Sequence, residues 1–132
     1  MTCYKWVNDY IGMPYLANGR GDAVDCYGLV MKVMQDQHGV KMPDWSVEHY
    51  SRSGAEDLLS DKAQESINKN MMTQVYGPQD FDIVLVHRFT RCLHIGIVIN
   101  GGVLHTQSKA SNWETISSFK KKFGNVRFYR WQ

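Results

Sequence analysis

One cysteine and two histidines have the residue types and spacing for nucleophilic catalysis. Cys26 stands between Asp25 and Tyr27, where a segment with helical apolar spacing begins. A thiol in the first turn of a helix favours the thiolate, because the helix dipole and unpaired amides stabilise negative charge. A nucleophile also needs a base. His94 and His105 are the best candidates, because they flank a predicted turn.

The same residues, taken one by one, leave other roles open. A cysteine such as Cys26 also packs well as a small apolar side chain, and a single histidine more often has a structural role. A metal site is a third hypothesis, in which Cys92 and His94 form a ligand pair. His105 or Cys26 would complete it. The sequence contains no C-x-x-C, H-x-x-x-H or H-E-x-x-H motif, so we expect no metal and no other cofactor.

The elements that must position these side chains are helices first and strands afterwards. Apolar spacing predicts a short helix over about Cys3 to Ile11. Residues 12–22 hold one proline and several glycines and are predicted to be a loop. The next helix begins after the cap Asp25 and ends at Gly39. Residues 54–71 are expected to form a mostly polar helix.

After residue 78 the sequence changes to strand-like segments rich in β-branched and aromatic residues. The tripeptide at residues 100–102, Asn-Gly-Gly, is a hairpin signal. A hairpin there would place His94 and His105 side by side, one as base and the other orienting it. Strands are predicted at Asp82–Arg88, Cys92–Ile99, Val103–Gln107 and Val126–Trp131, with a further strand at residues 112–116.

Length and composition fit one domain over residues 1–132. At 43% hydrophobic residues the chain has enough apolar surface for a core. Helices followed by an antiparallel meander predict an α+β fold. A formal charge of +2 is too small to indicate nucleic-acid binding, and residues 120–122, all lysine, are interpreted as a solvated face or turn. The count of three cysteines is odd, so at least one thiol should be free.

Four segments, in order, resemble one known family. IGMPYLANGRGDAVDCYGLVMKV carries a G-x-P-Y loop followed by D-C-x-G-L-V at a helix start. GPQDFDIVLVH is similar to a G-D-(I/L)-V-x-F strand, and HIGIVINGGVLHTQ to a strand pair that begins and ends near histidine. RFYRW is similar to the closing strand of phage tail members. Together these segments resemble the NlpC/P60 family of papain-like cysteine peptidases, over nearly the whole chain except residues 45–72.

The resemblance implies a role for each matching catalytic residue. Cys26 takes the place of the nucleophile and His94 that of the general base. His105 takes the third polar position, which orients the imidazole. Tyr15 matches a tyrosine whose hydroxyl, with the backbone amide of Cys26, forms the oxyanion hole. The fold implied is the papain-like one, with the nucleophile's helix packed on an antiparallel sheet.

The resemblance also implies the substrate, and the departures from the family pattern indicate a branch. Asp25 matches an acidic residue that contacts the substrate's amine in some members. Tyr27 replaces the serine of many free cell-wall members and is more like the phage tail branch. Phe81 replaces a glycine. We therefore expect Asp25 and Tyr27 to line the substrate site.

The expected activity is cleavage of an amide bond in peptidoglycan stem peptides, between D-glutamate and the diamino acid. The expected partners are the stem peptide and phage tail proteins, without nucleic acid or membrane. The opening stretch lacks a signal peptide pattern, so we expect synthesis in the bacterial cytoplasm and association with a virion tail that acts on the wall. The alternatives are another amide or thioester hydrolase or acyltransferase on this fold, and a non-catalytic tail-tip module.

Overall fold

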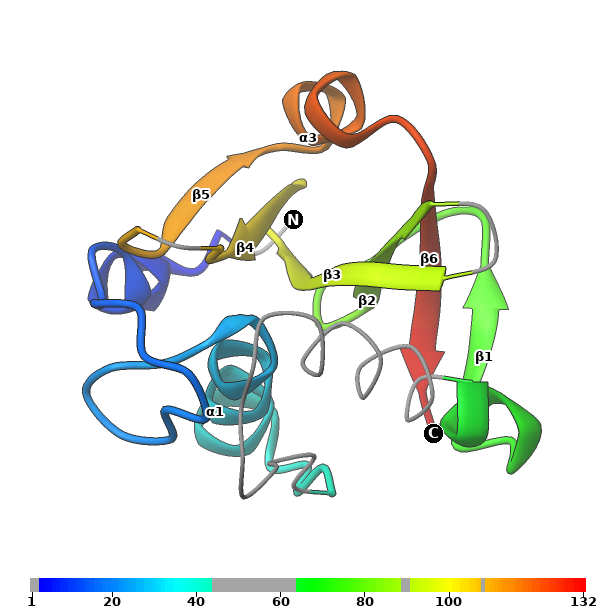
Figure 1. Cartoon of the computed structure of the whole chain (residues 1–132), viewed down its shortest axis with the longest axis horizontal. Coiled ribbons are helices and arrows are strands. Elements are labelled where there is room, and N and C mark those ends of the chain that lie inside the picture. The colour runs from blue at the N-terminus through cyan, green and yellow to red at the C-terminus, as the bar shows by residue number, and fades with distance from the viewer. Residues whose placement is uncertain (1–2, 44–63, 89–90, 108) are drawn as a thin grey trace.

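An antiparallel sheet with a helix packed against each face forms the framework of the described residues (Figure 1). The computed structural model describes residues 3–43, 64–88, 91–107 and 109–132. The strands are β1 (Met72–Val75), β2 (Ile83–Arg88), β3 (Arg91–Ile99), β4 (Gly102–His105), β5 (Asn112–Thr115) and β6 (Val126–Trp131). Their order in the sheet is β1-β6-β2-β3-β4-β5, so the predicted α+β class is confirmed.

The predicted meander holds from β2 to β5, and β6 departs from it. β6 crosses back to pair with both β2 and β1. β1 was not predicted, because its four residues, MTQV, are too few to show a period. The prediction that the β4 strand reaches Gln107 is wrong: it ends at His105, and the hydroxyl of Thr106 donates to the Lys109 carbonyl in a turn.

Helix α1 (Cys26–His38) is confirmed with both of its predicted ends. The Asp25 side chain accepts a hydrogen bond from the Gly28 amide, and Gly39 follows at φ +68°. The first predicted helix is wrong in type and length, since η1 (Lys5–Tyr10) is a short 3₁₀ helix without a side-chain cap. Residues 54–63 of the predicted helix at residues 54–71 lie outside the described residues. Of the rest, residues 64–68 are helical.

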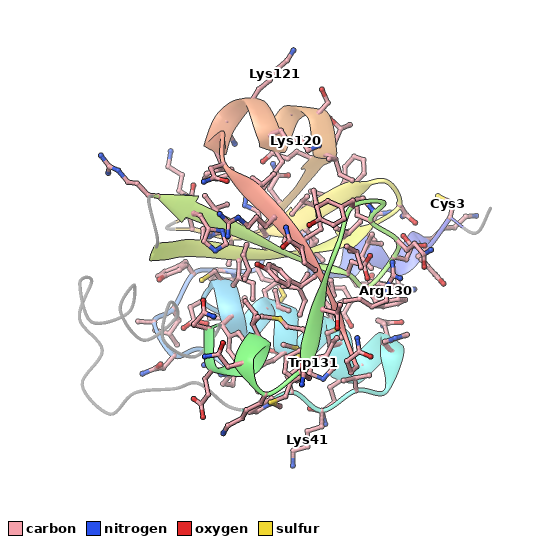
Figure 2. The ribbon with its side chains drawn as sticks, turned by 90° about the vertical axis from the view of Figure 1, so that its right-hand side faces the viewer. Cys3, Lys41, Lys120, Lys121, Arg130 and Trp131 are labelled. Atoms are coloured by element: carbon pink, nitrogen blue, oxygen red, sulfur yellow. The ribbon has the colours of Figure 1, made fainter. Side chains whose placement is uncertain are left out.

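Helix α3 (Ile116–Phe123) occupies a segment that was predicted to be a strand end followed by a turn. Thr115 caps it by accepting a bond from the Ser118 amide at 3.2 Å. The three lysines at residues 120–122 are exposed in its last turn, as expected, and Figure 2 shows Lys121 extending away from the molecule. Phe119 is fully buried beneath the helix.

The two faces of the sheet carry two separate apolar layers. Neighbouring residues of a strand point to opposite faces. Ile95 and Ile97 pack with the apolar residues of α1, whereas Val98 packs with Phe119 of α3. Figures 1 and 2 show α1 and α3 on opposite sides of the strands. Within the described part of the chain, no helix is long and apolar enough to span a membrane.

Side chains also tie distant segments to this sheet. Asn100, in the β3–β4 turn, accepts a bond from the amide of Tyr4 and donates one to its carbonyl, each at 2.9 Å. The buried carboxylate of Asp82, before β2, accepts two bonds from Arg130 of β6, again at 2.9 Å. These contacts fix the N-terminal segment and the last strand relative to β2 and β3.

Candidate active site

The two histidines lie together on adjacent strands, as the sequence predicts. Nε2 of His94 on β3 is 3.0 Å from Nδ1 of His105 on β4. Both side chains are buried, and their rings meet edge to face with centroids 5.2 Å apart. Phe119 and Phe123 of α3 pack against both rings. The pair is therefore held in a dry, aromatic setting.

The β3–β4 register explains how the two rings reach each other. Asn100 and Gly101 have φ of +54° and +72° in the turn, the conformation that a tight hairpin requires. The ladder pairs Ile97 with Leu104, so the next position places His105 opposite Gly96, diagonal to His94. A Cβ on Gly96 would lie 3.2 Å from that of His105, so the glycine leaves space for the second ring.

Glu114 on β5 continues the pair, and sequence reasoning missed it. Its Oε2 is 2.6 Å from Nε2 of His105. The β4–β5 ladder pairs His105 with Asn112, so Glu114 again lies on the diagonal. Two residues of α3 hold the carboxylate: Ser118 donates to Oε1 at 2.7 Å, and Lys122 donates to Oε2 at 3.3 Å. The alternation Asn112-x-Glu114 indicates that both side chains lie on one face of a strand. It indicates contact with His105 only once the register between β4 and β5 is known.

Burial sets the charge of this chain of three groups. Burial, together with the adjacent His105, lowers the pKa of His94 to about 3, against an opposing effect of Glu114. Burial likewise lowers the pKa of His105, against its hydrogen bond to Glu114. Burial raises the pKa of Glu114, but bonds from Ser118, His105 and Lys122 outweigh it and lower that pKa overall. At neutral pH the carboxylate is ionised and both imidazoles are neutral.

Cys26 is the first residue of α1, and it is half-buried. Asp25 before it is 3% exposed and accepts bonds from the amides of Asn18 and Gly28. The guanidinium of Arg20 lies 3.0 Å from the same carboxylate. This ion pair compensates a negative charge that would otherwise oppose a thiolate one residue away.

The backbone around Tyr15 is hydrogen-bonded to Val24, two residues before Cys26. It forms an isolated parallel bridge with Val24, whose amide donates to Pro14 and whose carbonyl accepts from Leu16. Ser111, before β5, holds the start of this loop: its hydroxyl accepts from the Met13 amide, and its carbonyl accepts from the Gly12 amide. The loop that carries Tyr15 is thus tied to both α1 and the β4–β5 connection.

The sequence profile described as the NlpC/P60 family matches residues 12–130. The chain belongs to the NlpC/P60 family. The crystal structure of the NlpC/p60 domain of peptidoglycan hydrolase SagA is similar over 96% of this chain and 92% of that one, with a TM-score of 0.61 and 18% identity. No match to a curated protein was found.

A second solved structure, a protein similar to lipoprotein of the NLP/P60 family from Staphylococcus aureus, is similar over 92% of this chain. Its TM-score is 0.56 and its identity 18%, and this chain spans 38% of that longer chain. At these identities both structures show the NlpC/P60 fold alone.

The described geometry gives physical reasons for several NlpC/P60 motif positions. Gly28 of D-C-x-G is required because a Cβ there would lie 2.2 Å from the carbonyl oxygen of Gly19. Phe81 replaces a glycine of the family yet keeps a left-handed φ of +72°. Its ring stacks on His38, with centroids 4.2 Å apart, and on Trp6 at 6.0 Å. These ring contacts offset the backbone strain that glycine would avoid.

The two residues expected to line the substrate site, Asp25 and Tyr27, make contacts with other residues of this NlpC/P60 chain. Asp25 caps α1 and pairs with Arg20, as described above. Tyr27 is 4% exposed; its hydroxyl donates to the carbonyl of Pro43, and Arg20 lies over its ring at 5.7 Å. Contact of Asp25 or Tyr27 with substrate stays a prediction.

The other histidines of the chain were not candidates for this site. His38 is exposed and His87 is half-buried at the end of β2, while His49 lies outside the described residues. Cys3 is exposed and free, so the prediction of a free thiol is confirmed. Among the described residues no cluster of three or more His, Cys, Asp or Glu side chains could hold a metal; the expected absence of a metal stays a prediction.

Cys26 and the two histidines come from opposite faces of the sheet. α1 packs against β3 and β4, but it does so through the layer that contains Ile95, whereas His94 packs with Phe123 of α3. The contact of Cys26 with Nδ1 of His94 stays a prediction.

Proposed function

We propose that this protein is a cysteine peptidase that cleaves an amide bond in peptidoglycan stem peptides. Membership of the NlpC/P60 family supports this activity. The observation that carries the proposal is the 3.0 Å contact between His94 and His105. It orients an unprotonated imidazole in a dry setting, and α1, which begins at Cys26, packs against the same strands.

The proposed reaction proceeds through an acyl-enzyme. The thiol of Cys26 gives its proton to Nδ1 of His94, and the thiolate attacks the scissile carbonyl carbon. The backbone amide of Cys26 and the hydroxyl of Tyr15 hold the tetrahedral oxyanion. When the C–N bond breaks, His94 protonates the leaving amine and a thioester remains on Cys26. Water then hydrolyses the thioester, with His94 as base.

The finer assignment is the bond between D-glutamate and the diamino acid, cleaved by a protein associated with a phage or prophage tail. Tyr27 after the nucleophile and the RFYRW ending support the tail branch by resemblance. The protein would be made in the bacterial cytoplasm and become part of a phage tail. The tail would carry it to the cell wall, where the enzyme would cleave the peptidoglycan locally.

Digestion of purified peptidoglycan, followed by mass spectrometry of the muropeptides, tests the activity and identifies the bond. Wild-type protein should release peptides cut between D-glutamate and the diamino acid. Cys26→Ala and His94→Ala should release none, while Cys3→Ala, which alters the exposed thiol, should match wild type. Products that persist in Cys26→Ala would refute the cysteine mechanism.

The two alternatives predict different outcomes in the same assay. A hydrolase or acyltransferase with another substrate would leave the muropeptides intact but turn over thioester or lipid substrates in a Cys26-dependent way. A structural tail-tip module would do neither and would retain binding to tail proteins after Cys26→Ala.

A further inference from the structure

We propose that Glu114 is a positioning residue that fixes which ring nitrogen of His94 is unprotonated and can act as base. The inference rests on the proposed function and extends the Cys26–His94–His105 set by one group. It is carried by the 2.6 Å contact between Oε2 of Glu114 and Nε2 of His105, next to the 3.0 Å contact between the two histidines.

The two contacts leave one arrangement of protons. An ionised carboxylate only accepts, so Nε2 of His105 must carry a proton and donate it to Glu114. A neutral imidazole has one N–H, so Nδ1 of His105 is then an acceptor. Nε2 of His94 must therefore donate to it, which leaves Nδ1 of His94 unprotonated. That nitrogen is the one available to take the proton of a thiol.

Helix α3 keeps the carboxylate in place for this task. The side chain of Glu114 is 10% exposed, and Ser118 and Lys122 bind its two oxygens from successive turns of the helix. The phenylalanines of the same helix cover the histidine rings. α3 thus supplies both the polar contacts that orient Glu114 and the apolar cover that keeps water from replacing it.

Nitrogen-15 NMR of the histidine rings in the whole protein at neutral pH tests the arrangement without substrate. Wild type should show His94 protonated at Nε2 and unprotonated at Nδ1. Glu114→Gln can either accept or donate through its amide, so this variant should show a mixture of the two tautomers at both histidines. Glu65→Gln is the matched control, because Glu65, like Glu114, forms an ion pair with a lysine, in its case Lys69 at 2.7 Å. Glu65 precedes β1, which lies at the opposite edge of the sheet from β5.

Peptidoglycan digestion gives the second measurement. Glu114→Gln should lower kcat by about ten- to a hundredfold, the size of effect seen when a group that orients a metal-bound histidine is removed, with KM nearly unchanged. Glu114→Asp keeps the charge and should recover part of the loss, and Glu65→Gln should match wild type.

The outcomes separate this inference from the proposed function. If wild type carries the His94 proton on Nδ1, or if Glu114→Gln keeps the wild-type tautomers and kcat, the role of Glu114 is refuted. If wild type leaves peptidoglycan intact, the proposed function fails, and the NMR result alone decides the tautomer. If Glu114→Gln does not fold, the wild-type spectrum alone tests the proposed tautomer of His94.

Discussion

The surroundings of His94 keep its imidazole uncharged, and this lowers the stability of the protein in acid. In the folded chain its pKa is lowered from 6.5 to about 3, whereas the unfolded chain keeps the ordinary value. Below pH 6.5 the unfolded state therefore binds more protons, and the stability contributed by this residue is lost as pH falls toward the folded pKa.

We expect this residue alone to lower the free energy of unfolding by roughly 3 kcal/mol between about pH 7 and pH 4.5, at about 1.4 kcal/mol per pH unit below the unfolded pKa. Urea unfolding at the two pH values measures it. His94→Leu should show a smaller pH dependence than wild type. Equal slopes for wild type and His94→Leu would contradict the assignment.

The placement of single residues of the candidate site was predictable where its cause was local. Cys26 was expected at a capped helix start, and that position and the capping by Asp25 are confirmed, whereas its role as nucleophile stays a prediction. Glu114 was not predictable, because its contact with His105 depends on two strand registers at once. The burial of Tyr27 was also hidden, since it arises from contacts with Pro43 and Arg20 that lie outside its helix.

At the scale of the elements, the β3–β4 hairpin is the part on which the histidine pair depends. A Cβ at residue 96 would lie 2.6 Å from Cγ1 of Val103 and 3.2 Å from Cβ of His105. We expect Gly96→Ala to lower the free energy of unfolding by about 1–3 kcal/mol, as overpacking does, and to lower activity because the His105 ring must move.

Thermal unfolding and peptidoglycan digestion check this prediction. Gly77→Ala is the control, because a Cβ at Gly77 meets nothing within 4 Å and its φ is not among the positive values. A Gly96→Ala protein with wild-type stability and activity would show that the space beside His105 is not needed.

Elements were predictable where one strong local signal set them. The Asn-Gly-Gly turn predicted the hairpin, and the cap and Gly39 predicted α1. The strand β1 carried no such signal, and its place beside β6 is set by tertiary pairing. α3 did carry one, since Ile116, Phe119 and Phe123 recur at helical spacing, but the lysine run obscured it.

At the scale of the whole molecule, Phe81 joins three segments that are distant in the sequence. Its ring packs against Tyr4 and Trp6 near the N-terminus and against His38 at the end of α1. Its backbone has a left-handed φ of +72°, which costs a residue with a Cβ about 1–2 kcal/mol.

Removing this ring should therefore reverse the usual order of glycine and alanine. Both Phe81→Ala and Phe81→Gly should be less stable than wild type, but the glycine variant should be the more stable of the two by about 1 kcal/mol. Ser117, exposed within α3, is the control, because alanine there should exceed glycine by about 1 kcal/mol. Chemical denaturation measures all four variants, and an alanine advantage at residue 81 would contradict the strain argument.

The attachment of the N-terminal segment limits where recombination between this chain and its relatives could occur without loss of structure. Tyr4 is bound through Asn100 of the hairpin turn, and Gly12 and Met13 through Ser111. A recombination event with its breakpoint between these partners would deliver a hairpin that lacks its matching N-terminal segment, and the loop that carries Tyr15 would lose its anchor. We therefore expect the segment at residues 4–13 and its partners Asn100 and Ser111 to be inherited together, although most of the chain separates them.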